Sequence, residues 1–425
     1  MTNATIAPVM ISRRNFLRYV VLSISGTIAA ACGRVVETAA PSSPAAALVL
    51  PSSAPSPAAS STAAALVSPT VTPSAVPTLA LSPTSSPSPT LAVTPTAFPP
   101  DLIKVRGDQF TLRGERFPIN GFNYYPRLHP WRTFNVGEWD SVGAERELRL
   151  AASLGANVVR IFVDYPFSLD TSASRPPDVY FELIPKYISN LREFIDLSGR
   201  LNIRVIVTLF DSVDWSIYQP YNQWMAQEYL KQIIPPFVGD PRIMCWDLQN
   251  EPDRAIVSVG PDVVIPFFKR VSAQIRQMDP DHLQTIGWID RARGKYFGDL
   301  DRYLDFWCFH FYDVIERLSD LIAFYKGKTT KPVLLQEFGL ATGGPGADGR
   351  HTELDQSLHY SRVYALITGY NLCGSVFWTL MDFPQGLAGN PPSPDDSPEN
   401  HFGVYRLDNS EKPVARAIRY AWTGR

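Results

Sequence analysis

Charge and glycine are missing from one long segment of the sequence. Residues 41–100 contain 14 Pro but no Gly, Asp, Glu, Lys or Arg. A segment of this composition cannot bury enough apolar surface to offset the entropy lost on folding, so it stays solvated. We therefore predict a disordered linker rich in Pro, Ser, Thr and Ala over residues 33–100. Removing the first 100 of the 425 residues leaves 325, a length that suits one folded domain over residues 101–425.

The sequence also lacks an excess of basic residues. Four of the 39 basic residues and one of the 41 acidic residues precede position 100, which leaves 35 basic and 40 acidic residues in the predicted domain. A mildly acidic domain has no electrostatic footprint for a phosphate backbone. We expect no nucleic-acid partner, and a neutral polymer or small molecule is favoured instead.

Cysteine is scarce, and its placement excludes a disulfide framework. Cys245, Cys308 and Cys373 form an odd set outside the first hundred residues, and all three lie in apolar runs. We expect buried free thiols. Only Cys308 and His310 lie at a close spacing that zinc sites use, and the sequence offers them no partner ligands, so we predict neither a metal nor another cofactor. We expect the domain to be a monomer.

The N-terminus has the pattern of an export signal. Residues 12–18 read Ser-Arg-Arg-Asn-Phe-Leu-Arg, and an apolar run follows from Tyr19 to Ala31. At about 1.5 Å per residue this run covers roughly 20 Å, too short for a bilayer core of about 30 Å. The paired arginines resemble a bacterial twin-arginine signal. We therefore predict a signal peptide over residues 1–32 and an exported protein.

The end of this signal is similar to a bacterial lipoprotein processing site. The junction reads Ala29-Ala30-Ala31-Cys32-Gly33, so Cys32 is the candidate for lipidation. Contact with a membrane would then occur only through this anchor, and the protein would lie at the cell surface. The alternative is cleavage after the Ala-x-Ala pattern, which would release an extracellular protein.

From residue 117 onward, short apolar runs alternate with longer amphipathic segments, which is typical of parallel βα units. Eight strands, each followed by a helix, favour a closed (β/α)8 TIM barrel over an open sheet. No glycine-rich phosphate motif follows the first strand, which argues against a dinucleotide fold. The predicted strands are Ile119–Tyr124, Val158–Val163, Ile203–Leu209, Ile243–Leu248, Gln284–Trp288, Phe306–Phe311, Pro332–Gln336 and Ser375–Thr379. The predicted helices are Glu145–Leu154, Leu183–Leu201, Val263–Met278, Asp313–Tyr325, Leu354–Thr368 and Lys412–Trp422.

Two of these strands end in a glutamate. The fourth runs into Asn250-Glu251-Pro252, and the seventh runs into Glu337-Phe338-Gly339. In such a barrel the functional residues come from the C-terminal ends of the strands. A carboxylate at the end of an apolar run is costly to desolvate unless it is paired or has a chemical role. Either glutamate alone could form a salt bridge at the barrel rim, whereas the pair suggests joint chemistry.

With these motifs, residues 101–425 resemble the retaining glycoside hydrolases with a (β/α)8 barrel, and most of all glycoside hydrolase family 5. The resemblance lies in strand ends two, four, six, seven and eight. The matching motifs are Arg160 after Asn157-Val158-Val159, Asn250-Glu251-Pro252, His310-Phe311-Tyr312, Glu337-Phe338-Gly339 and Phe377-Trp378.

The resemblance implies a role for each of these residues. Glu251 would be the acid/base and Glu337 the nucleophile, with the two carboxyl groups about 5–5.5 Å apart. A nearby cation and a hydrogen bond both favour an anion, so Arg160 and Tyr312 would keep Glu337 ionised and oriented. Asn250 would bond the 2-hydroxyl of the bound sugar.

His310 and Trp378 each have an alternative interpretation. A single histidine in an apolar strand is usually a core residue, but its position two residues before Tyr312 favours the site. Trp378 could be barrel packing, whereas the resemblance makes it a platform that stacks on the apolar face of a sugar.

The substrate class is indicated by one position where this sequence differs from cellulases of the family and by two segments that are similar to β-mannanases. Cellulases of this family usually carry a histidine after strand three, whereas this sequence has Asp211 there, which disfavours a glucan. The segments Gln109–Tyr125 and Trp246–Pro252 are similar to the β-mannanase branch. Aromatic residues that could line an extended cleft, or pack within loops, follow strands one, three and five: Trp131, Trp215, Tyr218, Tyr221, Trp224 and Trp288.

These observations favour an endo-β-1,4-mannanase that acts on plant-type β-1,4-linked polysaccharide or oligosaccharide. The alternatives are an endo-β-1,4-glucanase, an exo-β-glycosidase or a transglycosylase with the same intermediate. An inactive carbohydrate-binding surface lipoprotein would not need both Glu251 and Glu337. The loop Asp382–Tyr405 is long and rich in Pro and Asp, as substrate-covering loops often are.

Overall fold

The computed structural model describes residues 100–169, 182–289, 296–343 and 351–425. The predicted export signal, Cys32 and the linker up to residue 99 lie outside the described residues. Within the described part, no helix is long and apolar enough to cross a membrane.

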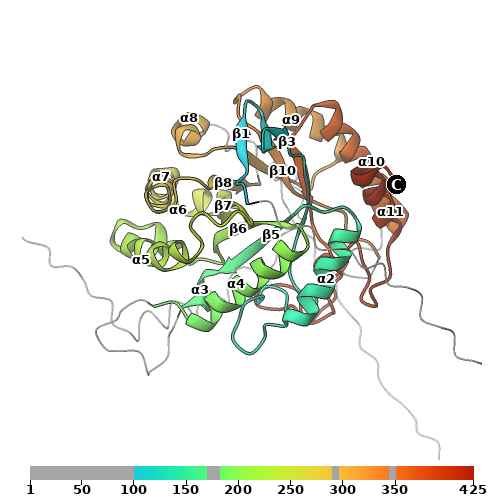
Figure 1. Cartoon of the computed structure of the whole chain (residues 1–425), viewed down its shortest axis with the longest axis horizontal. Helices are drawn as coiled ribbons and strands as arrows, with labels where there is room; N and C mark the ends of the chain where they lie inside the picture. Colours follow the sequence, from blue (N-terminus) through green and yellow to red (C-terminus); the bar gives the residue numbers. More distant parts are fainter. Residues whose placement is uncertain (1–99, 170–181, 290–295, 344–350) are drawn as a thin grey trace, which may run out of the picture. The chain divides into compact units, whose positions relative to one another are not determined.

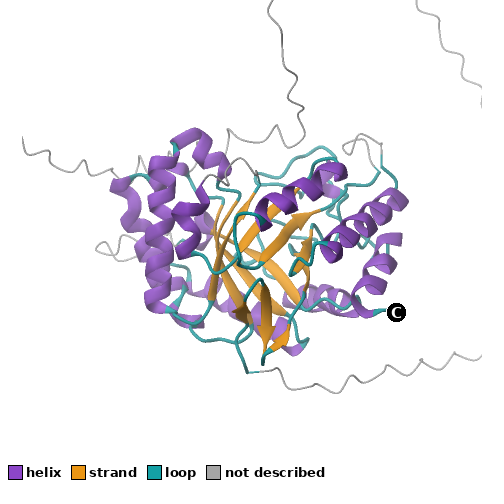
Figure 2. Ribbon diagram, turned by 90° about the horizontal axis from the view of Figure 1, so that it is seen from above, coloured by secondary structure: helices purple, strands orange, loops and turns teal. Residues whose placement is uncertain are grey.

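Eight parallel strands form a closed barrel in the order β10-β11-β4-β5-β6-β7-β8-β9. Helices surround the strands (Figures 1 and 2). The predicted (β/α)8 barrel is therefore confirmed. Every residue of the second and third barrel strands is buried, which explains why they read as continuous apolar runs. The strands are β4 (Ile119–Asn123), β5 (Val158–Asp164), β6 (Arg204–Asp211), β7 (Ile243–Asn250), β8 (Leu283–Trp288), β9 (Trp307–Phe311), β10 (Val333–Phe338) and β11 (Gly374–Phe377).

The helices between the strands bury their apolar faces against the barrel. All six predicted helices are present, although the one expected from Asp313 begins only at Leu318, after a 3-10 turn (Ile315–Arg317). The short α3, α6 and α8 and the longer α5 were not predicted. The helices are α2 (Ser141–Ser153), α3 (Tyr165–Ser168), α4 (Pro185–Arg200), α5 (Gln223–Ile233), α6 (Asp253–Val259), α7 (Pro261–Met278), α8 (Phe297–Leu300), α9 (Leu318–Lys326), α10 (Glu353–Gly369) and α11 (Pro413–Thr423).

A small antiparallel sheet covers the N-terminal end of the barrel. It consists of β1 (Lys104–Arg106), β2 (Gln109–Leu112) and β3 (Glu115–Arg116). Phe110 packs edge-to-face on Phe306 at 4.8 Å and belongs to a buried cluster that includes the first residues of several barrel strands. This end is therefore closed, and the opposite, C-terminal end carries the site. The three cysteines of the domain are buried free thiols, as expected.

The barrel closes where β11 pairs with β4, and a glycine is required there. Gly374 has a φ of +132°, and a Cβ at this position would lie 2.1 Å from the carbonyl oxygen of Ile119. We expect Gly374→Ala to lower the free energy of unfolding by at least about 1–3 kcal/mol, because the backbone of β4 cannot yield. Urea denaturation followed by circular dichroism measures this. Gly369→Ala is the matched control, since a Cβ there meets nothing within 4 Å; equal midpoints for the two variants would contradict the prediction.

Candidate active site

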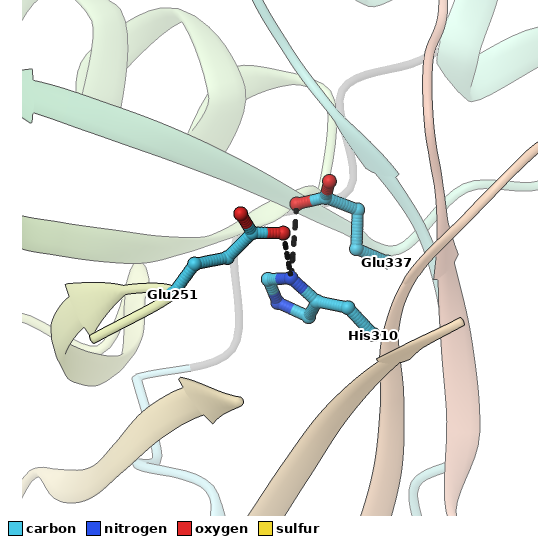
Figure 3. Close-up of side chains that lie close together, drawn as sticks. All are labelled: Glu251, His310 and Glu337. Carbon is cyan, nitrogen blue, oxygen red and sulfur yellow. Dashed lines mark hydrogen bonds and ion pairs between the residues drawn. The ribbon is translucent and has the colours of Figure 1, made fainter. Parts of the chain in front are cut away.

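The two predicted glutamates lie at the C-terminal end of the barrel and face each other (Figure 3). Glu337 is on β10, and Glu251 directly follows β7. Glu251 has a φ of 46°, which is uncommon for a residue other than glycine, and its N–H donates to the Gly287 carbonyl of β8 at 3.0 Å. This bond holds the Glu251 backbone in the conformation that presents its side chain to the site.

His310 on β9 contacts both carboxylates. Its Nδ1 lies 3.1 Å from Glu251 Oε1 and 3.6 Å from Glu337 Oε2 (Figure 3). One oxygen of each glutamate and a ring nitrogen of His310 all lie within 4.8 Å of one another. The structure thus brings the two carboxyl groups into a common site.

Arg160 on β5 organises the floor of this site. Its guanidinium is fully buried and donates to Asp247 at 2.9 Å, to Glu337 at 3.0 Å and to Asn250 Oδ1 at 2.9 Å. Tyr312 donates its hydroxyl hydrogen to the second oxygen of Glu337 at 2.7 Å. Glu337 is therefore held by one cationic and one neutral donor, while the Asn250 amide NH₂ remains available to a ligand.

The proton balance between Glu251 and His310 follows from their surroundings. Burial lowers the pKa of His310, but the charge of Glu337 and the bond to Glu251 outweigh burial and raise it above its ordinary value. Burial raises the pKa of Glu251, but His310, Arg254 and Arg160 outweigh it and lower the value. The two shifts therefore place the proton shared by the pair on His310 rather than on Glu251 in the free site.

The donor set does not favour a metal ion, although Glu251, His310 and Glu337 offer three ligand atoms close together. Arg160 already contacts Glu337 at 3.0 Å, and Arg254 on α6 contacts Glu251 at 3.0 Å. These two cations supply the positive charge that would otherwise call for a metal ion.

The family model "Cellulase (glycosyl hydrolase family 5)" matches residues 120–380, more than half of the chain and all eight barrel strands but the first residue of β4. The chain belongs to glycosyl hydrolase family 5. It is therefore an O-glycosyl hydrolase, and the motifs at its strand ends resemble the family for that reason.

This family 5 enzyme is similar in sequence to plant mannan endo-1,4-β-mannosidases and in fold to solved glycosidase structures. The chain is 24% identical to mannan endo-1,4-β-mannosidase 1 of Arabidopsis thaliana over 67% of its own length and 83% of the plant protein. An exo-β-1,4-mannosidase structure from Opitutaceae bacterium strain TAV5 matches 73% of the chain and 60% of that protein, with 20% identity and a TM-score of 0.58. A galacturonate-bound β-galacturonidase from Eisenbergiella tayi matches 76% of the chain, with 16% identity and a TM-score of 0.56, and the chain spans about half (54%) of its length. At these identities the solved structures establish only the shared barrel.

Trp378 and Asp211 also lie at the site of the family 5 enzyme. Trp378 directly follows β11, one residue beyond the strand, and packs in a cluster with Tyr125 and Phe162. Asp211 ends β6 and accepts a hydrogen bond from the Tyr125 hydroxyl at 3.2 Å. Burial, only partly offset by Arg160, raises the pKa of Asp211 to about 6.

Only some of the aromatic residues predicted to line a cleft are exposed. Trp215 lies in a 3-10 turn after β6 and is 38% exposed, and no contact within the described residues joins it to the carboxylates. Tyr218 and Trp288 are buried, and the Tyr218 hydroxyl donates to Gln249, so these two serve packing rather than a cleft.

Sequence reasoning missed three charged residues of the site, Asp247, Arg254 and Glu399. Arg254 lies on the first turn of α6, three residues after Glu251, which itself precedes the helix. Glu399 accepts a hydrogen bond from Trp378 Nε1 at 3.2 Å. It lies in the long loop after β11, where no periodic pattern points to the site.

Proposed function

We propose that this family 5 enzyme hydrolyses β-1,4-linked mannosyl bonds with retention of the anomeric configuration. The approach of Glu251 and Glu337, with oxygens within 4.8 Å of each other, carries the proposal. A retaining site holds its carboxyl groups about 5–5.5 Å apart, whereas an inverting site needs about 6.5–9.5 Å to admit a water molecule between them. The observed spacing favours retention.

In the first step Glu337 acts as the nucleophile and Glu251 as the acid. A Glu337 oxygen forms a bond to C1 while the bond from C1 to the leaving oxygen breaks, and Glu251 gives its proton to that oxygen. The donors Arg160 and Tyr312 orient the attacking carboxylate. The amide NH₂ of Asn250 bonds the 2-hydroxyl of the sugar.

In the second step a water molecule replaces the departed sugar. Glu251, now ionised, removes a proton from the water as its oxygen bonds to C1 and the ester bond to Glu337 breaks. Each of the two steps inverts the configuration at C1, so the product keeps the configuration of the substrate. Because Glu337 is uncharged while esterified, Glu251 no longer faces a second anion at this stage.

The Glu251–His310 pair supplies the proton for the first step. The proton that rests on His310 in the free site moves across the 3.1 Å contact to Glu251 as the substrate oxygen arrives. Because the two groups are coupled, the pair loses this proton with one macroscopic pKa rather than two separate values.

We expect His310→Gln to shift the alkaline limb of the pH profile of kcat/KM toward lower pH. The wild-type pair keeps its proton above the ordinary histidine value because the His310 pKa is raised. Glutamine still accepts a hydrogen bond but cannot store a proton, so Glu251 titrates alone. Loss of His310 removes part of what lowers the pKa of Glu251, but Arg254 and Arg160 still act against burial, so we expect activity to be lost at a lower pH than in the wild type. Initial rates between pH 4 and 9 measure the shift, and an unchanged limb would contradict the prediction.

Two observations support mannan as the substrate: the name of the Arabidopsis relative and the residue at the end of β6. The Arabidopsis relative is named a mannan endo-1,4-β-mannosidase. Asp211, in place of the histidine usual in cellulases, lies buried beside the Tyr125 hydroxyl. A carboxylate there accepts hydrogen bonds from sugar hydroxyls, which a histidine can do with only one nitrogen.

Two measurements test the proposal. The first compares kcat/KM on mannopentaose, cellopentaose and xylopentaose, with mannan, glucomannan, carboxymethyl-cellulose, xylan and β-1,3-glucan as polymers. The second records the first anomer released by proton NMR. We expect a preference for the mannosyl substrates and an initial β-anomer; an initial α-anomer would overturn retention, and a preference for another sugar would overturn the substrate class.

We further propose that the enzyme is exported and held at the cell surface through Cys32. The twin-arginine pattern and the lipoprotein-like junction support this, and the uncharged residues 41–100 would give the barrel reach from a membrane. Detergent phase partitioning of the mature protein tests it. We expect the wild type in the detergent phase and Cys32→Ser in the aqueous phase; recovery of the wild type in the aqueous phase would overturn the anchor.

A further inference from the structure

The two flanks of the carboxylate pair differ in exposure. On one flank, beside Glu251, the side chain of Arg254 is 59% exposed. On the other flank Tyr125, Asp164 and Trp378 are only 3%, 4% and 7% exposed. Among the described residues, the first flank is therefore open to solvent and the second is covered.

The roles proposed for the carboxyl groups decide which sugar lies on which flank. Because Glu251 protonates the departing oxygen, the leaving sugar lies on the open flank beside Arg254. The sugar attacked by Glu337 lies on the opposite flank, over Trp378. In a β-1,4-linked chain the next sugar toward the non-reducing end is attached to O4, across the ring from C1. That sugar would have to occupy the covered flank.

The cover is the loop Asp382–Tyr405, which joins β11 to α11. The ring of Phe383 packs on Trp131 with centroids 5.5 Å apart. Farther along, the amide of Asn390 donates to Asp164 at the end of β5 at 3.2 Å. The loop thus extends from β11 past the segment that follows β4, and the Asn390–Asp164 bond fixes it at the end of β5. The next sugar toward the non-reducing end would lie in this place.

The same loop places a further carboxyl group, that of Glu399, at the site. Glu399 Oε2 accepts the indole hydrogen of Trp378. Burial and the charge of Glu337 raise the pKa of Glu399 to about 7. An ionisable group is costly here, and a neutral amide would satisfy the Trp378 indole equally well. A carboxyl group is instead suited to binding the hydroxyl groups of a sugar that stacks on Trp378.

We propose that the loop Asp382–Tyr405 leaves room for only one sugar on the side of the site where Glu337 attacks. The enzyme then releases single residues from non-reducing chain ends, and Glu399 binds the hydroxyl groups of that terminal residue. This inference rests on the proposed function, because it uses the roles of Glu251 and Glu337. It replaces the internal cleavage implied by the resemblance to β-mannanases.

Mannopentaose labelled at its reducing end tests the position of cleavage. We expect unlabelled mannose and labelled mannotetraose as the first products, followed by a ladder that shortens by one residue. Labelled mannobiose or mannotriose among the first products would overturn this inference and leave the proposed function intact. Absence of cleavage of this and every other substrate in the panel would overturn the proposed function, and this inference with it.

Glu399→Gln tests the role of the Glu399 carboxyl group. Glutamine keeps the acceptor for Trp378 but cannot ionise, so it resembles the protonated glutamate present below pH 7. We expect KM for mannobiose to rise roughly 10- to 100-fold at pH 8, where the ionised wild-type group would accept charged hydrogen bonds, and to change little at pH 5.5, with kcat nearly constant. Asp395→Asn, an exposed residue of the same loop, is the control and should match the wild type. Equal KM values for wild type and Glu399→Gln at both pH values would overturn the role of Glu399.

Discussion

Glu337→Ala is expected to lower kcat by roughly 10⁴- to 10⁶-fold, the range seen when a nucleophile is removed from a site whose groups act as a unit. Alanine has no oxygen that can bond to C1, so the covalent intermediate cannot form. The remaining groups still bind the sugar, so KM should change far less than kcat. Single-turnover assays by mass spectrometry should show the glycosyl adduct on the wild type and not on the variant.

Azide distinguishes loss of the nucleophile from loss of the acid. In Glu337→Ala, azide can enter the space of the carboxylate and attack the same face of C1, which gives an α-glycosyl azide and never a β-product. In Glu251→Ala the intermediate still forms from substrates with good leaving groups, and azide then gives a β-glycosyl azide. Glu251→Ala should lose roughly 10²- to 10⁴-fold on mannobiose, the range for general acid catalysis.

The matched control for both variants is Glu228→Ala. Glu228 lies on α5 and pairs with Lys231 at the surface, so its removal should leave kcat within about two-fold. Near-wild-type turnover in Glu337→Ala, or azide products with the two configurations exchanged, would overturn the assignment of the nucleophile and the acid.

The barrel and its central residues could be predicted because their signals are local. Each parallel strand is buried on both faces and reads as an apolar run. Glu251, His310 and Glu337 lie near the C-terminal ends of such runs, where a barrel places its site, whereas Arg160 is the third residue of β5 and not at its end as predicted. The two carboxyl groups belong to residues 86 positions apart, yet the strand ends and the family resemblance together predicted that they share one site.

Features without a strong periodic pattern were missed. Strands β1 to β3 are only two to four residues long, too short for an alternating pattern. Arg113 and Gly114, which join β2 to β3, both have positive φ, as in a two-residue hairpin. Helix α5 was overlooked because its Trp224, like nearby Tyr221, was interpreted as cleft lining. Glu399 could not be placed, since its position depends on how a loop without regular strands folds back onto Trp378.

Arg160→Met is expected to lower the free energy of unfolding by about 3–5 kcal/mol and also to abolish measurable activity. Arg160 and Asp247 are both fully buried and bonded at 2.8 Å. Methionine fills much of the same volume but leaves the Asp247 carboxylate with only the neutral donors Thr208 and Gln336, at 2.9 Å and 3.2 Å. Urea denaturation of the purified variant measures the loss.

A double variant separates stability from chemistry. Arg160→Met with Asp247→Asn removes the isolated buried charge, so we expect it to recover much of the lost stability. Activity should not recover, because Glu337 still lacks the cation that contacts it at 3.0 Å and Asn250 lacks the donor that orients its amide. Arg317→Met, which removes a surface pair with Asp313, is the control and should cost less than about 1 kcal/mol. If the double variant were as active as the wild type, Arg160 would have no role in orienting Glu337, and its place in the barrel would be structural only.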